Sequence, residues 1–349
     1  MTYDALLLVS FGGPEGPDEV MPFLENVLRG KNVPRERMLA VAEHYQHFGG
    51  VSPINEQNRA LLAALKNELT SHGIDLPVYW GNRNWHPMLA DTLEEMKQDG
   101  VKHALAFFTS GFSSYSGCRQ YRENIAVAQQ TVGDGAPAVD KLRVFFNHPG
   151  FIEPMIERVR AAFEQIPAER REQAVLLFTA HSIPLSMATN CKYETHFAEA
   201  SRLISEGVNH PQHRLVYQSR SGPANQPWLE PDVGDVLKEL AAAAGEVRDV
   251  VVVPVGFISD HMEVMFDLDY EALHLAEELG LNLVRAGTVG THPRFVTMIR
   301  ELIEERIAAA PKLSLGALGP SHDVCPTDCC KYEPRRPMPP AAESRPTAC

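Results

Sequence analysis

Two short segments of this chain supply an imidazole and a carboxylate, and each follows an apolar run. His181 comes directly after residues 174–180, and Glu263 comes a few residues after the run 249–257. The carboxyl ends of parallel strands meet at one edge of a sheet, where open α/β proteins place their chemistry. Neither segment opens a glycine-rich phosphate loop. The pair therefore predicts a site that handles a cation or a proton rather than a nucleotide.

The acidic side of this predicted site continues along the chain. Asp267 and Glu271 follow Glu263 at intervals of four residues, which on an α-helix stacks three carboxylates on one face. Like charges at this spacing repel one another, and a divalent cation that prefers oxygen ligands relieves the repulsion. The alternative interpretation is an acidic surface helix. In the first interpretation, Asp267 and Glu271 pass protons or ions between the site and solvent.

Five segments of the chain together resemble the ferrochelatase family, which inserts iron(II) into a porphyrin. They are residues 8–14, 49–55, 180–184, 218–220 and 254–263, and the resemblance runs from about residue 3 to about residue 310. The chain is most similar to the actinobacterial branch, which is understood to convert coproporphyrin III into iron coproporphyrin. The resemblance implies Fe²⁺ as a substrate and a hand-over of the product to a decarboxylase that completes haem b.

The resemblance also implies roles for individual residues. His181 and Glu263 match residues that hold the iron or take up pyrrole protons. Phe11 matches a position on the opposite face of the porphyrin, where some relatives carry a tyrosine that can approach the metal. The phenylalanine ring has no oxygen for such a contact. Three further positions that contact porphyrin propionates in the family correspond to Arg29, Ser52 and Tyr121.

One more departure from the family concerns an outer metal site. Some bacterial relatives carry a Lys-His pair where this chain has Arg83-Asn84. The resemblance therefore gives no support for an outer metal site here.

Ordinary structural roles are the alternatives for the three propionate positions. Arg29 would be a charge at a helix C-terminus, Ser52 a turn residue and Tyr121 a partly buried aromatic.

The cysteines predict a second site, near the end of the chain. Half of the six cysteines lie close together, at Cys325, Cys329 and Cys330. In a cytoplasmic protein such a group more often binds metal than forms disulfides. Zinc accepts the same thiolates. Several ferrochelatases, however, carry a C-terminal [2Fe–2S] cluster with three late cysteines and one internal cysteine, and this tail resembles that arrangement.

The internal ligand of such a cluster has two candidates. Cys118 is preferred because its segment, 115–121, resembles the branch and is expected near the active site, and Cys191 is the runner-up. Cys349 ends a proline-rich stretch that is typical of a disordered tail and is a poor fixed ligand.

Composition narrows the class of protein. With 349 residues, of which 44% are hydrophobic, the chain can bury a large core. A net charge of −13 argues against nucleic acid and against an anionic membrane surface as the main partner. No apolar stretch approaches the ~20 residues of a transmembrane helix, and the start of the chain lacks the pattern of a signal peptide. We expect a cytoplasmic monomer.

The pattern of elements predicts an α/β protein with parallel sheets covered on both faces. Strands are expected near 4–10, 76–81, 102–109, 142–147, 174–180, 214–219, 249–257 and 282–286. Helices are expected near 17–29, 53–72, 87–99, 118–132, 150–166, 193–208, 232–243, 261–279 and 292–309. We expect two similar four-stranded, Rossmann-like lobes with the active site in the cleft between them, and the family resemblance implies that they are of the class II chelatase kind.

The family resemblance implies a different role for each part of the chain. Residues 1–167 are expected to bind the porphyrin, residues 168–312 to provide the metal and proton site, and residues 313–349 to form a cysteine-containing extension that is partly disordered. Other functions remain open at this point: protoporphyrin IX as the substrate, a cobalt or nickel chelatase, and a haem or metal carrier without turnover. A hydrolase that uses Ser182 lacks the Gly-x-Ser-x-Gly elbow.

Overall fold

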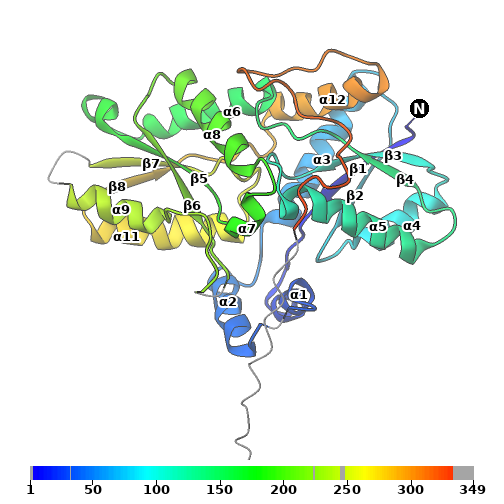
Figure 1. The fold of residues 1–349 in the computed structure, drawn as a ribbon, viewed down its shortest axis with the longest axis horizontal. Helices are drawn as coiled ribbons and strands as arrows, with labels where there is room; N and C mark the ends of the chain where they lie inside the picture. Colours follow the sequence, from blue (N-terminus) through cyan, green and yellow to red (C-terminus); the bar gives the residue numbers. More distant parts are fainter. Residues whose placement is uncertain (1–2, 32, 223–224, 244–247, 333–349) are drawn as a thin grey trace, which may run out of the picture.

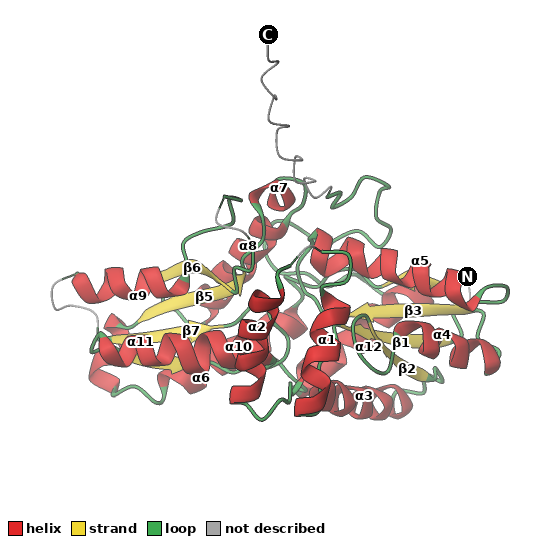
Figure 2. Cartoon of the chain, turned by 90° about the horizontal axis from the view of Figure 1, so that it is seen from below, coloured by secondary structure: helices red, strands yellow, loops and turns green. Residues whose placement is uncertain are grey.

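The computed structural model describes residues 3–31, 33–222, 225–243 and 248–332, and it contains two parallel four-stranded sheets side by side (Figures 1 and 2). The strand order is β2-β1-β3-β4 in one sheet and β6-β5-β7-β8 in the other. The strands are β1 Ala5–Ser10, β2 Val78–Asn82, β3 His103–Phe108, β4 Ala138–Lys141, β5 Val175–His181, β6 His213–Gln218, β7 Asp249–Val253 and β8 Asn282–Arg285. The expected α/β class with two four-stranded sheets is confirmed.

Both sheets have the same topological switch point. In each, the first strand in sequence lies inside the sheet, the second pairs on one side of it, and the third pairs on the other. Loops that leave the carboxyl ends on the two sides of such a switch point diverge and leave space for a ligand. The switch points therefore lie between β1 and β3 in one half and between β5 and β7 in the other.

Helices cover both faces of the sheets. They are α1 Val20–Val27, α2 Arg35–His47, α3 Ile54–Ser71, α4 Leu89–Gln98, α5 Gln120–Val132, α6 Pro149–Phe163, α7 Leu185–Ala188, α8 Tyr193–Gly207, α9 Val233–Ala242, α10 Met262–Val264, α11 Leu273–Glu278 and α12 Pro293–Ile307. The residues of β1 alternate between two apolar clusters, as the pleat of a strand requires: Leu6 and Leu8 join the central cluster, while Ala5, Leu7 and Val9 pack toward α4 and α5.

Two helices connect the halves of the molecule. α6, which follows the first sheet in sequence, packs against α8, β7 and β8, and α12 packs against both α6 and α3. Arg300 of α12 pairs with Glu68 of α3 at 2.9 Å. The expected division at residue 167 remains a prediction: α6, which precedes this residue, packs on the second sheet, and α12, which follows it, packs on α3 of the first half.

The fourth strand differs from the prediction. The apolar run 142–147 is not a strand; the strand is the preceding segment Ala138–Lys141, which is shorter and partly exposed. Phe145 instead packs its ring on Phe107 at a centroid distance of 5.3 Å, inside the central cluster. The apolar residues of this run pack in a core between the halves and do not belong to a sheet. An apolar run alone does not distinguish a buried strand from another buried segment.

The helices differ from the prediction in several places, one of which is the short helix α7, which was not expected. The sequence prediction missed α2, in which only Ala42 is buried, so that no apolar stripe marks it. The expected helix 261–279 is broken into α10, a π-helical segment Met265–Ala272, and α11. π-Helical turns are frequent at functional sites. α2 lies on this segment, with the ring of His44 stacked on Phe266 at 3.7 Å.

The chain beyond α12 folds back over the first half as far as it is described. Asn147 donates its side-chain amide to the carbonyls of Leu315 and Gly319, at 3.0 and 2.9 Å. The expected disorder of the extension, and Cys349, fall on residues 333–349, outside the described residues. In the part of the chain that the structure describes, no helix is long and apolar enough to cross a bilayer.

Candidate active site

His181 and Glu263 come together at the switch point of the second sheet. His181 is the last residue of β5, and Glu263 lies in α10, a few residues after β7, the strand paired with β5. The Nε2 atom of His181 lies 3.5 Å from Oε1 of Glu263. Their side chains are 29% and 47% exposed, so both groups remain accessible. The juxtaposition expected from the sequence is therefore present.

Backbone contacts fix the orientation of the His181 ring. Its Nδ1 contacts the carbonyl oxygen of Ser182, which can only accept a hydrogen bond, so Nδ1 carries a proton and donates it. The hydroxyl of Tyr193 donates to the carbonyl of His181 at 2.9 Å. With Nδ1 committed to the backbone, Nε2 is the nitrogen that faces Glu263 and is available for chemistry.

The two groups form an ion pair. Desolvation opposes protonation of His181, but the charge of Glu263 and its hydrogen bond outweigh it and raise the imidazole pKa to about 9. Desolvation likewise opposes ionisation of Glu263, but the charge of His181 prevails and lowers the carboxyl pKa to about 2. At neutral pH the protein alone thus holds an imidazolium against a carboxylate.

Asp267 extends the site. The hydroxyl of Ser219 donates to Oδ2 of Asp267. Burial raises the pKa of Asp267 to about 7; the bond from Ser219 opposes the shift, and the charges of Glu263 and Glu271 add to it. Burial, with a smaller effect of Asp232, also raises the pKa of Glu271. The three carboxylates thus interact through their charges, and Asp267 is poised to exchange a proton near neutral pH.

The first half contributes an aromatic and cationic group. Phe11 follows β1 and is 36% exposed. The guanidinium of Arg83 lies over the ring of Phe11 at 5.7 Å and over that of Tyr121 at 4.4 Å. The sequence interpretation considered Arg83 only as a departure from the family. The position of Arg83 could have revealed it as a site residue, because Arg83 directly follows β2 and so lies at the same edge of the sheet as Phe11.

The remaining predicted porphyrin contacts occupy different environments. Ser52 is buried at 4% exposure, and its N–H donates to the carbonyl of Pro14 at 2.8 Å. A Cβ atom at Gly13 would lie 2.7 Å from the Cβ of Ser52, which is too close. The segments that carry Gly13 and Ser52 therefore need a glycine at position 13 to approach each other this closely. Tyr121 is 5% exposed. Arg29 is exposed and lies just after α1. The structure therefore brings Phe11 and Tyr121 together through Arg83, whereas Arg29 lies on the surface.

Residues from the first half also reach the second. Gln57 of α3 forms two hydrogen bonds with the backbone of Asp260, each 2.9 Å long. Tyr45 of α2 interacts with the charge of Glu263, which adds to the effect of burial in raising the tyrosine pKa. The sequence interpretation missed both residues. Tyr45 belongs to the helix that was not predicted, and nothing in the sequence pairs Gln57 with a loop 203 residues away.

Cys118 interacts with one of the late cysteines, Cys325. The interaction between the thiols of Cys118 and Cys325, together with burial, raises the pKa of Cys118, and the same interaction lowers the pKa of Cys325. Arg119, next to Cys118, donates to the carbonyls of Thr327 and Cys329 at 2.9 and 3.2 Å and so docks the tail. Cys191 instead directs its sulfur to the carbonyls of Met187 and Ala188.

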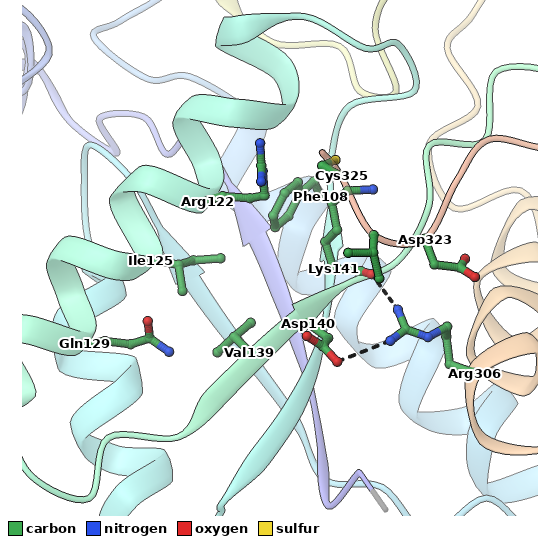
Figure 3. A pocket seen from close by; sticks show the side chains of 11 residues that line it. Phe108, Arg122, Ile125, Gln129, Val139, Asp140, Lys141, Arg306, Asp323 and Cys325 are labelled. Carbon is green, nitrogen blue, oxygen red and sulfur yellow. Dashed lines mark hydrogen bonds and ion pairs between the residues drawn. The ribbon is translucent and has the colours of Figure 1, made fainter. Parts of the chain in front are cut away.

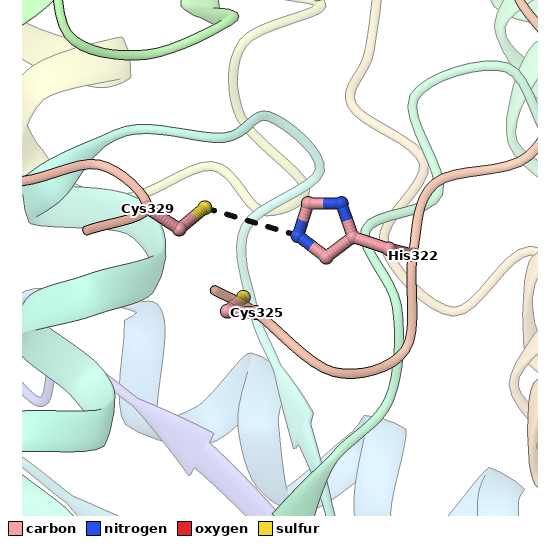
Figure 4. Close-up of side chains that lie close together, drawn as sticks. All are labelled: His322, Cys325 and Cys329. Atoms are coloured by element: carbon pink, nitrogen blue, oxygen red, sulfur yellow. Dashed lines mark hydrogen bonds between the residues drawn. The ribbon is translucent and has the colours of Figure 1, made fainter. Parts of the chain in front are cut away.

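These thiols have the spacing of metal ligands. The sulfurs of Cys329 and Cys330 lie 3.7 Å apart. A metal that binds two sulfurs at about 2.3 Å in tetrahedral geometry separates them by about 3.8 Å. His322 was missed by the sequence interpretation, although it lies three residues before Cys325. Its ring lies beside Cys325 and Cys329, with ligand atoms within 4.8 Å of one another (Figure 4).

Known proteins resemble this chain over almost its whole length. The family model described as ferrochelatase matches residues 3–307. The ferrochelatase of Rhodopirellula baltica is 61% identical, over 99% of this chain and 97% of its own length. The coproporphyrin III ferrochelatase of Streptomyces coelicolor is 51% identical over 98% and 97%, and that of Nocardia farcinica is 50% identical over 99% and 100%.

A solved structure shares the fold at low sequence identity. SirB from Bacillus subtilis with Fe³⁺ superposes with a TM-score of 0.54 at 14% identity, covering 88% of this chain and 98% of SirB. This likeness shows that the two proteins share a fold. With a family model spanning most of its length and relatives more than half identical to it, the chain belongs to the ferrochelatase family.

Proposed function

We propose that this protein inserts Fe²⁺ into coproporphyrin III. The observation that carries the proposal is the His181–Glu263 pair at the β5/β7 switch point, 3.5 Å between Nε2 and Oε1, in a chain of the ferrochelatase family. Metal insertion requires that two pyrrole N–H protons leave while a hydrated cation loses water. An imidazole and a carboxylate in contact can supply both a ligand and a proton acceptor.

The protonation of the pair suggests an order of events. Because the pKa of His181 is about 9 in the protein alone, the ring is protonated at neutral pH and must lose its proton before it can ligate iron or accept a pyrrole proton. An incoming dication opposes the imidazolium and favours that loss. Asp267, with a pKa of about 7, receives the proton without a large energetic mismatch, and Glu271 passes it on toward solvent.

The first half is proposed to hold the macrocycle. Phe11 offers an exposed apolar face, and Arg83 beside it provides a cation for a propionate. Arg29, Ser52 and Tyr121 are proposed as further propionate contacts, from the family resemblance. Because Tyr121 is buried under Arg83, its contact with a propionate requires the guanidinium to shift or to bind the same group.

The choice of porphyrin rests on the relatives. Those from Streptomyces coelicolor and Nocardia farcinica are named for coproporphyrin III, which carries a propionate on every pyrrole ring, whereas protoporphyrin IX has vinyl groups on two of them. Anaerobic Fe²⁺ insertion, assayed side by side with both porphyrins, tests the proposal. A higher kcat/KM with coproporphyrin III supports it, and a preference for protoporphyrin IX refutes the substrate assignment. Binding without turnover of either porphyrin would indicate a carrier.

We further propose a [2Fe–2S] cluster on Cys118, Cys325, Cys329 and Cys330. The 3.7 Å separation of the Cys329 and Cys330 sulfurs suits a shared metal, and the interaction of Cys118 with Cys325 favours Cys118 over Cys191 as the internal ligand. When bound, such a cluster would link the tail covalently to the body. The visible spectrum and the iron and sulfide content of anaerobically purified protein test it. Zinc without iron or sulfide would refute the cluster.

The setting of the enzyme follows from the same proposal. Thiols that bind a cluster require a reducing compartment, so we propose a cytoplasmic enzyme. We propose that it acts as a monomer and delivers iron coproporphyrin to a decarboxylase that completes haem b. Size-exclusion chromatography with light scattering tests the monomer.

A further inference from the structure

The body of the protein presents two cations at the place where the cysteines of the tail dock. Lys141 ends β4, and Arg122 lies in the first turn of α5. Both line a cavity of about 240 Å³ that Cys325 closes at one end. Figure 3 shows the Lys141 side chain directed toward Cys325, with Arg122 on the facing helix. The tail and the body therefore meet across a cationic surface.

Neither cation has an acidic partner. Lys141 is 8% exposed, and its ammonium has one long contact of 3.5 Å, to the carbonyl of Leu142. The Nε of Arg122 is buried without a hydrogen-bond partner. Within residues 3–31, 33–222, 225–243 and 248–332, neither side chain forms an ion pair with a carboxylate.

The nearby carboxylates are engaged elsewhere. Asp140 and Asp323 line the same cavity, but Asp140 pairs with Arg306 at 3.2 Å and Asp323 with Lys312 at 2.5 Å. A buried charge without a counter-charge is costly, and proteins rarely retain one. An anion that faces Lys141 and Arg122 would remove this cost.

The sulfurs are the groups within reach that become anionic when they bind a metal. The charge of Lys141 acts on both Cys118 and Cys325, and that of Arg122 acts on Cys325 and Cys329. The two cations thus act through their charge on three of the four proposed cluster ligands, and one of these, Cys325, lines the same cavity as both cations. They come from the body, whereas Cys325 and Cys329 come from the tail, so the attraction also holds the tail in place.

We propose that Lys141 and Arg122 are the counter-charges of the thiolate site, and that they raise the reduction potential of the cluster bound there. This inference rests on the proposed cluster. A reduced [2Fe–2S] centre carries one more negative charge than the oxidised one, and the surrounding charge is one of the factors that set its potential. Fixed cations beside the sulfurs favour the reduced state because they compensate the added electron.

The test uses the full chain, purified anaerobically, as Lys141→Met, Arg122→Gln and the double variant. Lys102→Met, an exposed lysine just before β3, is the matched control. Midpoint potentials are measured by dithionite titration with redox mediators and electron paramagnetic resonance. We expect the double variant to show at least a tenfold lower ratio of reduced to oxidised cluster at a given potential, a shift of 59 mV for one electron. The control and Lys141→Arg should stay near the parent.

Other outcomes are equally decisive. An unchanged midpoint in a double variant that keeps its cluster overturns the proposal. If the double variant loses its cluster, the iron and sulfide content of the single variants decides. A cluster retained in Lys141→Arg but lost in Lys141→Met supports the counter-charge. A cluster lost in both variants overturns the proposal. A parent that contains no thiolate-bound metal also overturns it.

The chelatase activity separates this inference from the proposed function. Neither cation belongs to the proposed active site, so Fe²⁺ insertion into coproporphyrin III should be unchanged in variants that retain their cluster. If the parent carries zinc, competition with a chromophoric chelator replaces the redox titration, because a zinc thiolate site is also anionic. A tenfold loss of zinc affinity in the double variant would then support the counter-charge, although the cluster assignment had failed, and an unchanged affinity would overturn it.

Discussion

The side chain of Gln57 and the backbone of Asp260 exchange two hydrogen bonds: Nε2 of Gln57 donates to the Asp260 carbonyl, and Oε1 accepts from the Asp260 N–H, each at 2.9 Å. Asp260 also accepts from Arg285 at 2.8 Å. The loop that carries Glu263 is therefore held from α3 in one half and from β8 in the other. The position of the carboxylate depends on how the two halves meet.

Gln57→Ala is expected to lower kcat/KM about tenfold, because it frees the loop that positions Glu263. It leaves a backbone N–H and a carbonyl without partners, at a cost of about 1–3 kcal/mol. Iron insertion and urea unfolding measure the two effects. Gln46→Ala, which removes an exposed contact of 3.3 Å to Pro17, is the control. Activity equal to that of the control would show that the loop keeps its place without Gln57.

His181→Ala is expected to reduce iron insertion by a factor of about 10²–10⁴, the typical contribution of a positioned proton acceptor. The fold should remain, because the ring is partly exposed and its loss opens no core cavity. Circular dichroism and a thermal melt check the fold. Turnover within about threefold of the parent would contradict a role as ligand or base.

Glu263→Gln is expected to damage activity far more than Glu271→Gln, because only Glu263 contacts His181. The same change should lower the pKa of His181 from about 9, since the charge of Glu263 is what raises it. NMR titration of the imidazole measures the shift in both variants. Equal losses of activity would instead indicate a shared path for protons or ions.

The His181–Glu263 pair also predicts a pH dependence of stability. A raised imidazole pKa stabilises the folded state below the unfolded value of 6.5, and this contribution disappears as the pH rises through about 9. Asp267 acts in the same direction at lower pH: its raised carboxyl pKa favours the folded state below 3.8, and the advantage disappears as the pH rises through about 7.

Asp267→Asn should therefore flatten the decline in stability between about pH 4 and pH 7 while it slows proton removal. Urea unfolding across this range measures how steeply the free energy of unfolding falls with pH. Asp269→Asn is not a suitable control, because Asp269 pairs with Arg285. Glu271→Gln provides a milder comparison. A slope identical to that of the parent would show that Asp267 titrates in the folded protein as it does in the unfolded chain.

Truncation before Cys325 is expected to abolish the visible absorption of the cluster and to lower the soluble yield, because a metal that links tail and body contributes folding stability. Cys118→Ser should lose the absorption and Cys191→Ser should retain it, because of these two internal cysteines only Cys118 interacts with Cys325. Cys349→Ser should change neither property. Loss in Cys191→Ser alone would reverse the assignment of the internal ligand.

The sequence by itself determined the elements and the chemistry of their ends. Alternation of apolar runs with helical stretches predicted two parallel sheets, and the residues after the runs 174–180 and 249–257 identified His181 and Glu263. This succeeded because local period and strand ends depend on near neighbours in the chain. The sequence also shows the grouping of Cys325, Cys329 and Cys330, and the family resemblance led to the proposal of Cys118 as their fourth partner.

Only the tertiary structure decided how distant residues act on one another. It placed the run 142–147 in a core between the halves rather than in a sheet, and it broke the acidic helix at the π-helical segment Met265–Ala272. It brought Gln57 and Tyr45 to the Glu263 loop and set Lys141 and Arg122 against the tail cysteines. These relationships depend on packing between segments far apart in the chain, and the pKa values follow from that packing, because burial and opposing charge are properties of the assembled site.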